Sequence, residues 1–207
     1  MKRWPVWLPF CAMLLAACSA RQVQQPPGGP QELAYQARSA DLATLDGWEF
    51  SGRLAVDDGT DGGSGRLLWL TEGPVSELDF RGAMGRGAWH LAMSPGEAVL
   101  KKGDGGTARA PDVDQLVLLE TGWHLPVDAL QWWVRGLRAP GAFDELFLDD
   151  GGRLQRFRQS GWTIEYKRYR DVSGIAMPHR MEAVSGTYRV KLAVSRWRLG
   201  DGDAGSG

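Results

Sequence analysis

Residues able to do chemistry are few and scattered in this 207-residue chain. None of its three histidines has a histidine or carboxylate partner at the spacing of a metal site; they are His90, His124 and His179. The three aspartates between residues 57 and 61 lack the twelve-residue spacing and closing glutamate of a calcium loop, so we interpret them as a solvated turn. The glycine clusters match no phosphate-binding loop, and no GxSxG motif occurs. The sequence therefore predicts no catalytic residue, no metal and no enzyme activity.

The two cysteines both lie near the N-terminus, which reads MKRWPVWLPFCAMLLAACSA. A basic start, an apolar run and small residues before Cys18 are typical of a secretory signal that is too short to span a bilayer. The last four residues of the run, Leu15–Cys18, resemble a bacterial lipobox. That resemblance implies a signal peptide over 1–17 and a covalent lipid on Cys18, and Ser19 is compatible with export to the outer membrane. The alternative is an ordinary signal that is cleaved near Ala20.

The rest of the chain is predicted to be a short tether followed by one domain. Residues 18–30 are rich in Pro, Gly and polar residues and predict a flexible tether. Removing residues 1–17 leaves about 190 residues, enough for one domain. It also leaves 22 basic and 25 acidic residues, which do not indicate a nucleic-acid surface. No cysteine remains to form a disulfide within the domain, and no later segment is apolar enough to cross a bilayer.

The elements that must position any site follow from the hydrophobic period. Helix formers over 31–45 predict a helix with Leu33, Ala37, Ala40 and Leu45 buried. Two further helices are predicted over 112–122, with Asp112 as cap and Gly122 as stop, and over 126–136. Alternating apolar residues predict strands over the following ranges: 48–56, 66–70, 78–81, 89–93, 98–102, 154–159, 162–167 and 188–197. The domain is expected to cover 31–198, and the tail over 199–207 to be disordered.

Many alternating strands around two central helices indicate a mainly β fold with helices. We expect a half-open antiparallel β-barrel with a helical lid over an apolar cavity. Plain core packing is the alternative for every residue that we assign to the cavity. From the strands we assign Trp48, Phe50, Leu54, Leu78, Phe80, Trp89, Leu91, Trp162, Ile164, Val190 and Leu192, and from the lid Leu130 and Val134.

Met84 stands at the tip of a predicted hairpin, FRGAMGRGAW at 80–89, where it cannot easily reach the core. Its neighbours Gly82 and Gly85 suit a tight surface turn. A surface methionine without a role is the simplest interpretation, since single exposed apolar residues are common.

Several short motifs, in order behind the lipobox, give Met84 a second interpretation. They are Trp48-x-x-x-Gly52-Arg53-Leu54-Ala55-Val56, Leu68-Trp69, Gly82-x-Met84-Gly85, Leu130-x-x-Trp133-Val134-Arg135-Gly136, Gln159-x-Gly161-Trp162, Tyr166-x-x-Tyr169, Met177-Pro178, and Arg189-Val190-Lys191-Leu192 ahead of Trp197. Together they resemble the LolB family of outer-membrane lipoprotein receptors, over about residues 31–198.

The resemblance implies a lipid-anchored acceptor that faces the periplasm. Such a protein receives client lipoproteins from the periplasmic carrier LolA and places them in the inner leaflet of the outer membrane. It holds their acyl chains transiently, touches outer-membrane phospholipid, and needs no cofactor besides its own anchor; a monomer is expected. The family also implies a membrane-insertion loop with an exposed apolar residue, usually leucine, and the matching segment is Gly82, Met84 and Gly85. Two alternatives stay open: an assembly lipoprotein that binds proteins but no acyl chains, and a lipid-processing enzyme.

Overall fold

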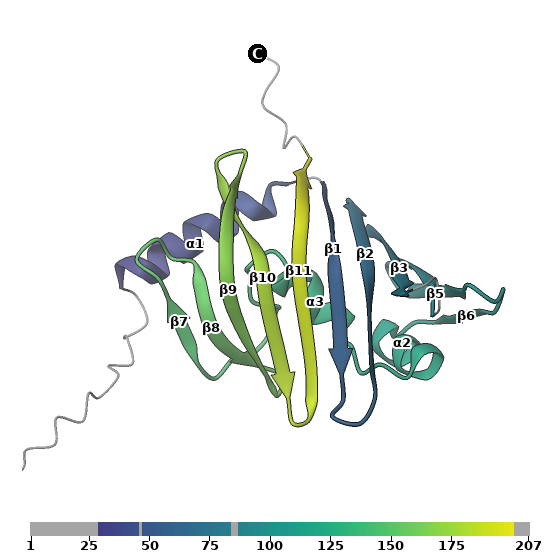
Figure 1. Ribbon diagram of the computed structural model, residues 1–207. Coiled ribbons are helices and arrows are strands. Elements are labelled where there is room, and N and C mark those ends of the chain that lie inside the picture. Colours follow the sequence, from purple (N-terminus) through teal and green to yellow (C-terminus); the bar gives the residue numbers. More distant parts are fainter. Residues whose placement is uncertain (1–28, 46, 84–86, 201–207) are drawn as a thin grey trace, which may run out of the picture.

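The computed structural model describes residues 29–45, 47–83 and 87–200 (Figure 1). Three helices are present in these ranges: α1 (Pro30–Ala43), α2 (Val113–Thr121) and α3 (Val127–Trp133). The strands are β1 (Gly47–Asp57), β2 (Gly62–Glu72), β3 (Val75–Gly82), β4 (Trp89–Ser94), β5 (Glu97–Lys102), β6 (Thr107–Ala110), β7 (Leu146–Leu148), β8 (Leu154–Gln159), β9 (Trp162–Val172), β10 (Ile175–Ser185) and β11 (Tyr188–Leu199). No helix in the described part has the length and hydropathy to cross a bilayer.

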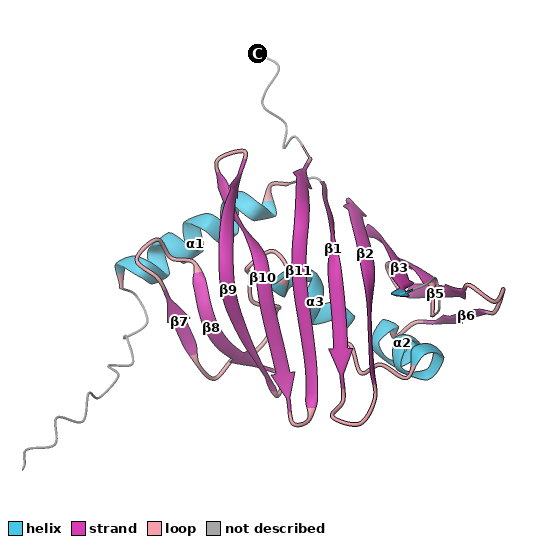
Figure 2. Cartoon of the chain, viewed as in Figure 1, coloured by secondary structure: helices cyan, strands magenta, loops and turns pink. Residues whose placement is uncertain are grey.

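All these strands form one antiparallel sheet in the order β6-β5-β4-β3-β2-β1-β11-β10-β9-β8-β7. Hairpins join nearest neighbours on each side, and the pairing of β1 with β11 unites the two halves of the chain. The edge strands β6 and β7 do not pair with each other, so the sheet is open rather than closed. Helices α1 and α3 pass behind the strands in the view of Figure 2, and α2 lies beside β5 and β6, which it contacts. The predicted half-open antiparallel barrel with helices across it is confirmed.

Strand β1 shows how the sequence pattern sets the two faces of the sheet. Trp48, Phe50 and Leu54 are buried, whereas Arg53 between them is exposed. A register shift between Ser51 and Gly52 bends the strand against β11. At Gly52 a Cβ atom would lie 2.5 Å from the carbonyl oxygen of Ala193, so only glycine fits this close approach.

Three strands are absent from the sequence-based prediction, namely β6, β7 and β10. Strand β10 buries three consecutive residues, Met177, Pro178 and His179, and its register shifts on both sides of Arg180. These irregularities break the period of two on which a strand prediction depends. Strands β6 and β7 have only four and three residues, too few to show any period.

The predicted second helix is confirmed almost to the residue. Asp112 caps α2 by accepting a hydrogen bond from the backbone N–H of Gln115, and Gly122 ends the helix at φ 76°. Helix α3 ends at Trp133, shorter than the predicted 126–136. Strand β2 starts at Gly62, before the predicted start at residue 66.

The predicted buried face of the first helix is wrong, although the helix itself is present. Leu33 is 61% exposed, and Ala37 and Ala40 are also exposed. The helix instead buries Tyr35 and Leu42. A tyrosine is hard to recognise as an inward residue from hydrophobicity alone, because its burial here depends on a hydrogen-bond partner elsewhere in the fold.

The predicted signal peptide at 1–17 and most of the tether lie outside the described residues, as does the tail from residue 201. Strand β11 continues to Leu199, one residue beyond the predicted end of the domain.

Candidate functional site

The thirteen residues that the sequence assigned to a cavity are all buried in one apolar cluster. They are Trp48, Phe50 and Leu54 of β1, Leu78 and Phe80 of β3, Trp89 and Leu91 of β4, Trp162 and Ile164 of β9, Val190 and Leu192 of β11, and Leu130 and Val134 at α3. Eleven of them project from five strands onto the same inner face of the sheet. The structure thus joins residues from both ends of the chain into one continuous apolar surface, which we call the inner face.

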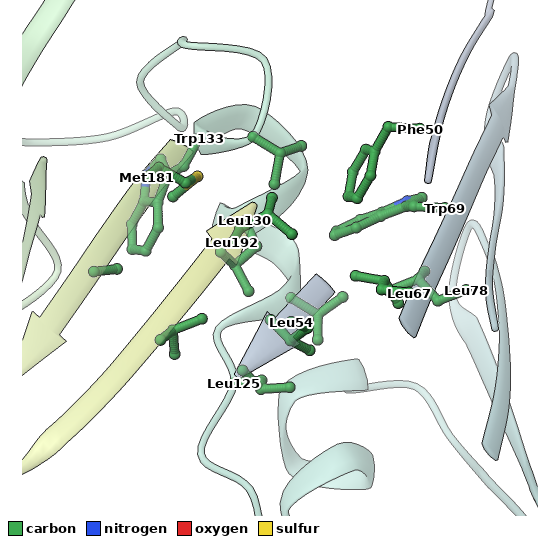
Figure 3. Packing of buried hydrophobic residues seen from close by; sticks show 14 of the residues in the cluster. Phe50, Leu54, Leu67, Trp69, Leu78, Leu125, Leu130, Trp133, Met181 and Leu192 are labelled. Atoms are coloured by element: carbon green, nitrogen blue, oxygen red, sulfur yellow. The ribbon is translucent and has the colours of Figure 1, made fainter. Parts of the chain in front are cut away.

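Helix α3 and the segment before it cover this inner face. Figure 3 shows Leu130 of α3 and Leu125 between side chains of β1 and β2 on one side and of β10 and β11 on the other. Leu67, Trp69 and Met181 belong to the same cluster, although the sequence did not assign them to the cavity. The side chains of α3 therefore pack directly on the inner face.

Aromatic rings make up much of the inner face. Trp48 and Phe50 stack with ring centroids 6.1 Å apart, and Trp69 and Trp197 pack against both. The indole N–H of Trp197 donates to the carbonyl of Pro178 at 2.8 Å. The buried indole N–H of Trp69 has no hydrogen-bond acceptor among the described residues. An unsatisfied buried donor is unfavourable by about 1–3 kcal/mol.

A hydrogen-bond network around Gln159 fastens the C-terminal end of α3 to the sheet. The side-chain oxygen of Gln159 accepts from the indole N–H of Trp133 at 3.1 Å and from the backbone N–H of Ala139 at 3.0 Å. Its amide group donates to the carbonyl of Ala139 at 2.7 Å. The hydroxyl of Tyr166 donates to the carbonyl of Trp133 at 2.7 Å. Burial raises the pKa of Tyr166 well above its ordinary value, so the hydroxyl keeps the proton that it donates.

Helix α1 also contacts the C-terminal end of α3. Arg38 donates from its guanidinium to the carbonyl of Arg135, 3.2 Å away, just beyond the end of α3. A cation at a helix C-terminus interacts favourably with the free carbonyls there. At Gly136, whose φ is 77°, a Cβ atom would lie 3.1 Å from the hydroxyl oxygen of Tyr169. The quoted motifs contain most of these residues, but sequence spacing does not reveal that they meet.

The predicted membrane-insertion loop connects β3 and β4. Phe80 and Trp89, which pair across the two strands, stack with centroids 5.3 Å apart and give the connection a rigid base. Gly82 ends β3 and is half-buried. Met84 and Gly85 lie outside the described residues, as does Cys18.

The three histidines lie in separate environments. His90 contacts the carboxylate of Asp79 at 3.2 Å on the outer face, and His124 packs against the rings of Trp162 and Tyr188. His179 is buried in β10. Within the described ranges no group of three or more metal-binding side chains comes together.

Comparison with known proteins supplies the family. The family model described as outer membrane lipoprotein LolB matches residues 46–197. The outer-membrane lipoprotein LolB of Stutzerimonas stutzeri (strain A1501) is 35% identical over 191 residues, which cover 92% of this chain and 93% of that protein. The protein of the same name from Pseudomonas putida (strain F1) is 36% identical over 188 residues, 89% of this chain and 91% of that protein.

Solved structures agree on the fold. A LolA superfamily protein from Nitrosomonas europaea superposes with a TM-score of 0.50 at 12% identity, over 79% of this chain and 94% of that one. A DUF1329 family protein from Desulfovibrio piger gives a TM-score of 0.50 at 9% identity, over 86% of this chain and 95% of that one. From the family match and the identities over almost the whole chain, this protein belongs to the LolB family of outer-membrane lipoproteins.

Proposed function

We propose that this protein is the membrane-anchored acceptor that takes lipoproteins from the periplasmic carrier LolA and inserts them into the inner leaflet of the outer membrane. The observation that carries the proposal is the continuous inner face, to which β1 to β4 and β9 to β11 all contribute and which is covered by helices of only nine and seven residues. Short covering elements of this kind open at lower free energy than the sheet itself. In the proposed loaded state, acyl chains replace the contacts that Leu130 and its neighbours make with the sheet.

The physical chemistry of the client supports transfer between two apolar interiors. Each buried CH₂ group stabilises a bound acyl chain by roughly 0.8 kcal/mol, so releasing one chain of about fourteen carbons into water is unfavourable by on the order of 10 kcal/mol. The client therefore passes directly from one protein to the next. The chain has no nucleotide-binding motif, so differences in affinity drive the transfer in our proposal. The indole N–H of Trp69, which has no acceptor in the described part of the chain, offers a donor to a carbonyl of the acylated client.

The proposed anchor keeps the acceptor beside its destination. A lipid on Cys18 and the Pro- and Gly-rich tether place the domain on the periplasmic side of the outer membrane. Tethering raises the effective concentration of the acceptor at the membrane without any new contact. No further cofactor and no second copy of the chain are needed.

Insertion is proposed to use the β3–β4 connection. Phe80 and Trp89 stack at the base of this connection, at one end of the sheet. Met84 at that tip provides a flexible apolar side chain for the lipid headgroup region. Arg81 at its base is exposed and available to anionic headgroups.

The test is a reconstituted transfer of a labelled lipoprotein from the carrier to liposomes, with the parent protein and with Met84→Glu. We expect Met84→Glu to take up the lipoprotein normally and to insert only a small fraction of it. Pro95→Glu is the matched control, since it places the same charge at the exposed β4–β5 turn, at the opposite end of β4. Normal insertion by Met84→Glu would refute the role of the loop. Failure of the parent protein to accept any lipoprotein, or to bind a hydrophobic dye, would refute the acceptor function itself.

A further inference from the structure

A groove separates α1 from the segment that follows α3. Its volume is about 580 Å³, which is within the usual range for a small-molecule site. Apolar and aromatic side chains form most of its wall, among them Tyr35, Trp132, Leu137 and Phe143. Arg135 and Arg138 also line the groove and add two guanidinium groups to its wall. The groove is thus amphipathic, with cations set among aromatic rings.

The two arginines differ in their partners. Arg138 forms an ion pair with Glu32, with a nitrogen–oxygen distance of 3.4 Å. Arg135 lies over the rings of Trp132 and Trp48, at 5.0 and 5.6 Å from their centroids. Its Nε donates to the carbonyl of Gln131 at 3.0 Å. In the described part of the chain no carboxylate comes within 4.0 Å of Arg135, and its terminal nitrogens have no acceptor there.

An incompletely paired cation in a partly desolvated groove favours an anionic ligand. Burial lowers the pKa of Arg135, which reflects the unfavourable transfer of its charge out of water. The two indole rings compensate part of this through cation–π contacts. The free edge of a guanidinium has the geometry for two parallel hydrogen bonds to a phosphate.

We propose that this groove binds the phosphate headgroup of a glycerophospholipid. Arg135 contacts the phosphate, and the rings of Trp132 and Phe143 cover the glycerol and the first methylene groups. The apolar wall favours a lipid over free inorganic phosphate. The recessed position of the cation between α1 and α3 favours a small headgroup over an acidic protein surface. Arg135 touches the inner face at the ring of Trp48, but the proposed lipid binding does not depend on lipoprotein transfer.

Binding of soluble lipid monomers tests this directly. The protein is the mature chain, residues 18–207, with Cys18→Ser so that no anchor lipid competes. Isothermal titration calorimetry measures dihexanoyl phosphatidylglycerol below its micelle concentration, with inorganic phosphate and octyl glucoside as separate probes. We expect Arg135→Gln to weaken phosphatidylglycerol binding about tenfold, as for the loss of a charge-assisted hydrogen bond, and to leave octyl glucoside binding unchanged. Arg109→Gln, an exposed arginine on β6, is the matched control and should bind like the parent.

A second variant tests the proposal independently of whether Arg135→Gln folds correctly. Gln36 is exposed on α1 and lines the groove, so Gln36→Trp fills the groove without disturbing the core and should abolish binding. The proposal is overturned if either variant binds phosphatidylglycerol as tightly as the parent, or if inorganic phosphate binds as tightly as the lipid. It is also overturned if Arg135→Gln loses only the affinity for the carrier, since the groove would then be a protein-docking site. No lipoprotein or carrier takes part in the lipid titrations, so their failure is distinct from failure of the acceptor function.

Discussion

Replacing Gln159 by methionine should loosen the end of α3 and destabilise the whole domain. The two side chains have similar volume, so the change removes hydrogen bonds without opening a large cavity. Gln159 is 1% exposed and takes part in three hydrogen bonds, with the indole of Trp133 and with both backbone groups of Ala139. Each buried group left without a partner is unfavourable by about 1–3 kcal/mol.

The partners differ in how far water can replace the lost bond. Trp133 is fully buried, so its indole N–H should carry the full penalty. Ala139 is half-buried, so water can restore part of its bonding. We therefore expect the free energy of unfolding to fall by roughly 3 kcal/mol. At a typical denaturant slope of about 2 kcal/mol per molar, the urea midpoint should fall by about 1.5 M.

The assay is urea unfolding followed by tryptophan fluorescence, together with amide hydrogen exchange at Ala139. Exchange at this N–H should accelerate because it loses its acceptor. Gln155→Met is the matched control, because Gln155 is exposed on the same strand and should change the stability by less than about 0.5 kcal/mol. A loss below about 1 kcal/mol in Gln159→Met, with unchanged exchange at Ala139, would show that this network does not hold α3 to the sheet.

Two further predictions concern packing and pH. Gly65→Ala should destabilise the domain by about 1–3 kcal/mol in urea unfolding, because the new Cβ would lie 2.3 Å from the carbonyl oxygen of Arg81. Ser64→Ala on the same strand is the control and should be nearly neutral. Equal stability of the two variants would contradict this packing. Burial lowers the pKa of His179 below its ordinary value of 6.5, so the unfolded chain binds the proton first as the pH falls. Its stabilising contribution is therefore fully present above about pH 6.5 and is lost on acidification through that value towards the lower folded pKa. His179→Gln should lose less stability than the parent between pH 7.5 and pH 5 in thermal unfolding, and an equal loss would show that His179 is not the group responsible.

Local sequence patterns were sufficient for much of the secondary structure. The cap at Asp112 and the stop at Gly122 delimit α2 because both act within one turn of the helix. The alternation of β1 and β11 identified the inward residues, since successive side chains on a strand point to opposite faces. Where the alternation fails, at the irregular strand β10, the prediction failed with it.

By itself the sequence determined the mainly β character of the domain and thirteen of the apolar residues that lie buried on or over the inner face, whereas the anchor at Cys18 stays a prediction. Each of these follows from neighbouring residues or from the hydrophobic period of a strand or a helix. Only the tertiary structure decided which face of α1 is buried, that Gln159 and Tyr166 fasten α3, and that Arg135 lies beside a groove. These contacts join residues 20 to 103 positions apart, as with Ala139 to Gln159 and Tyr35 to Arg138, and no local pattern records which distant side chains will meet.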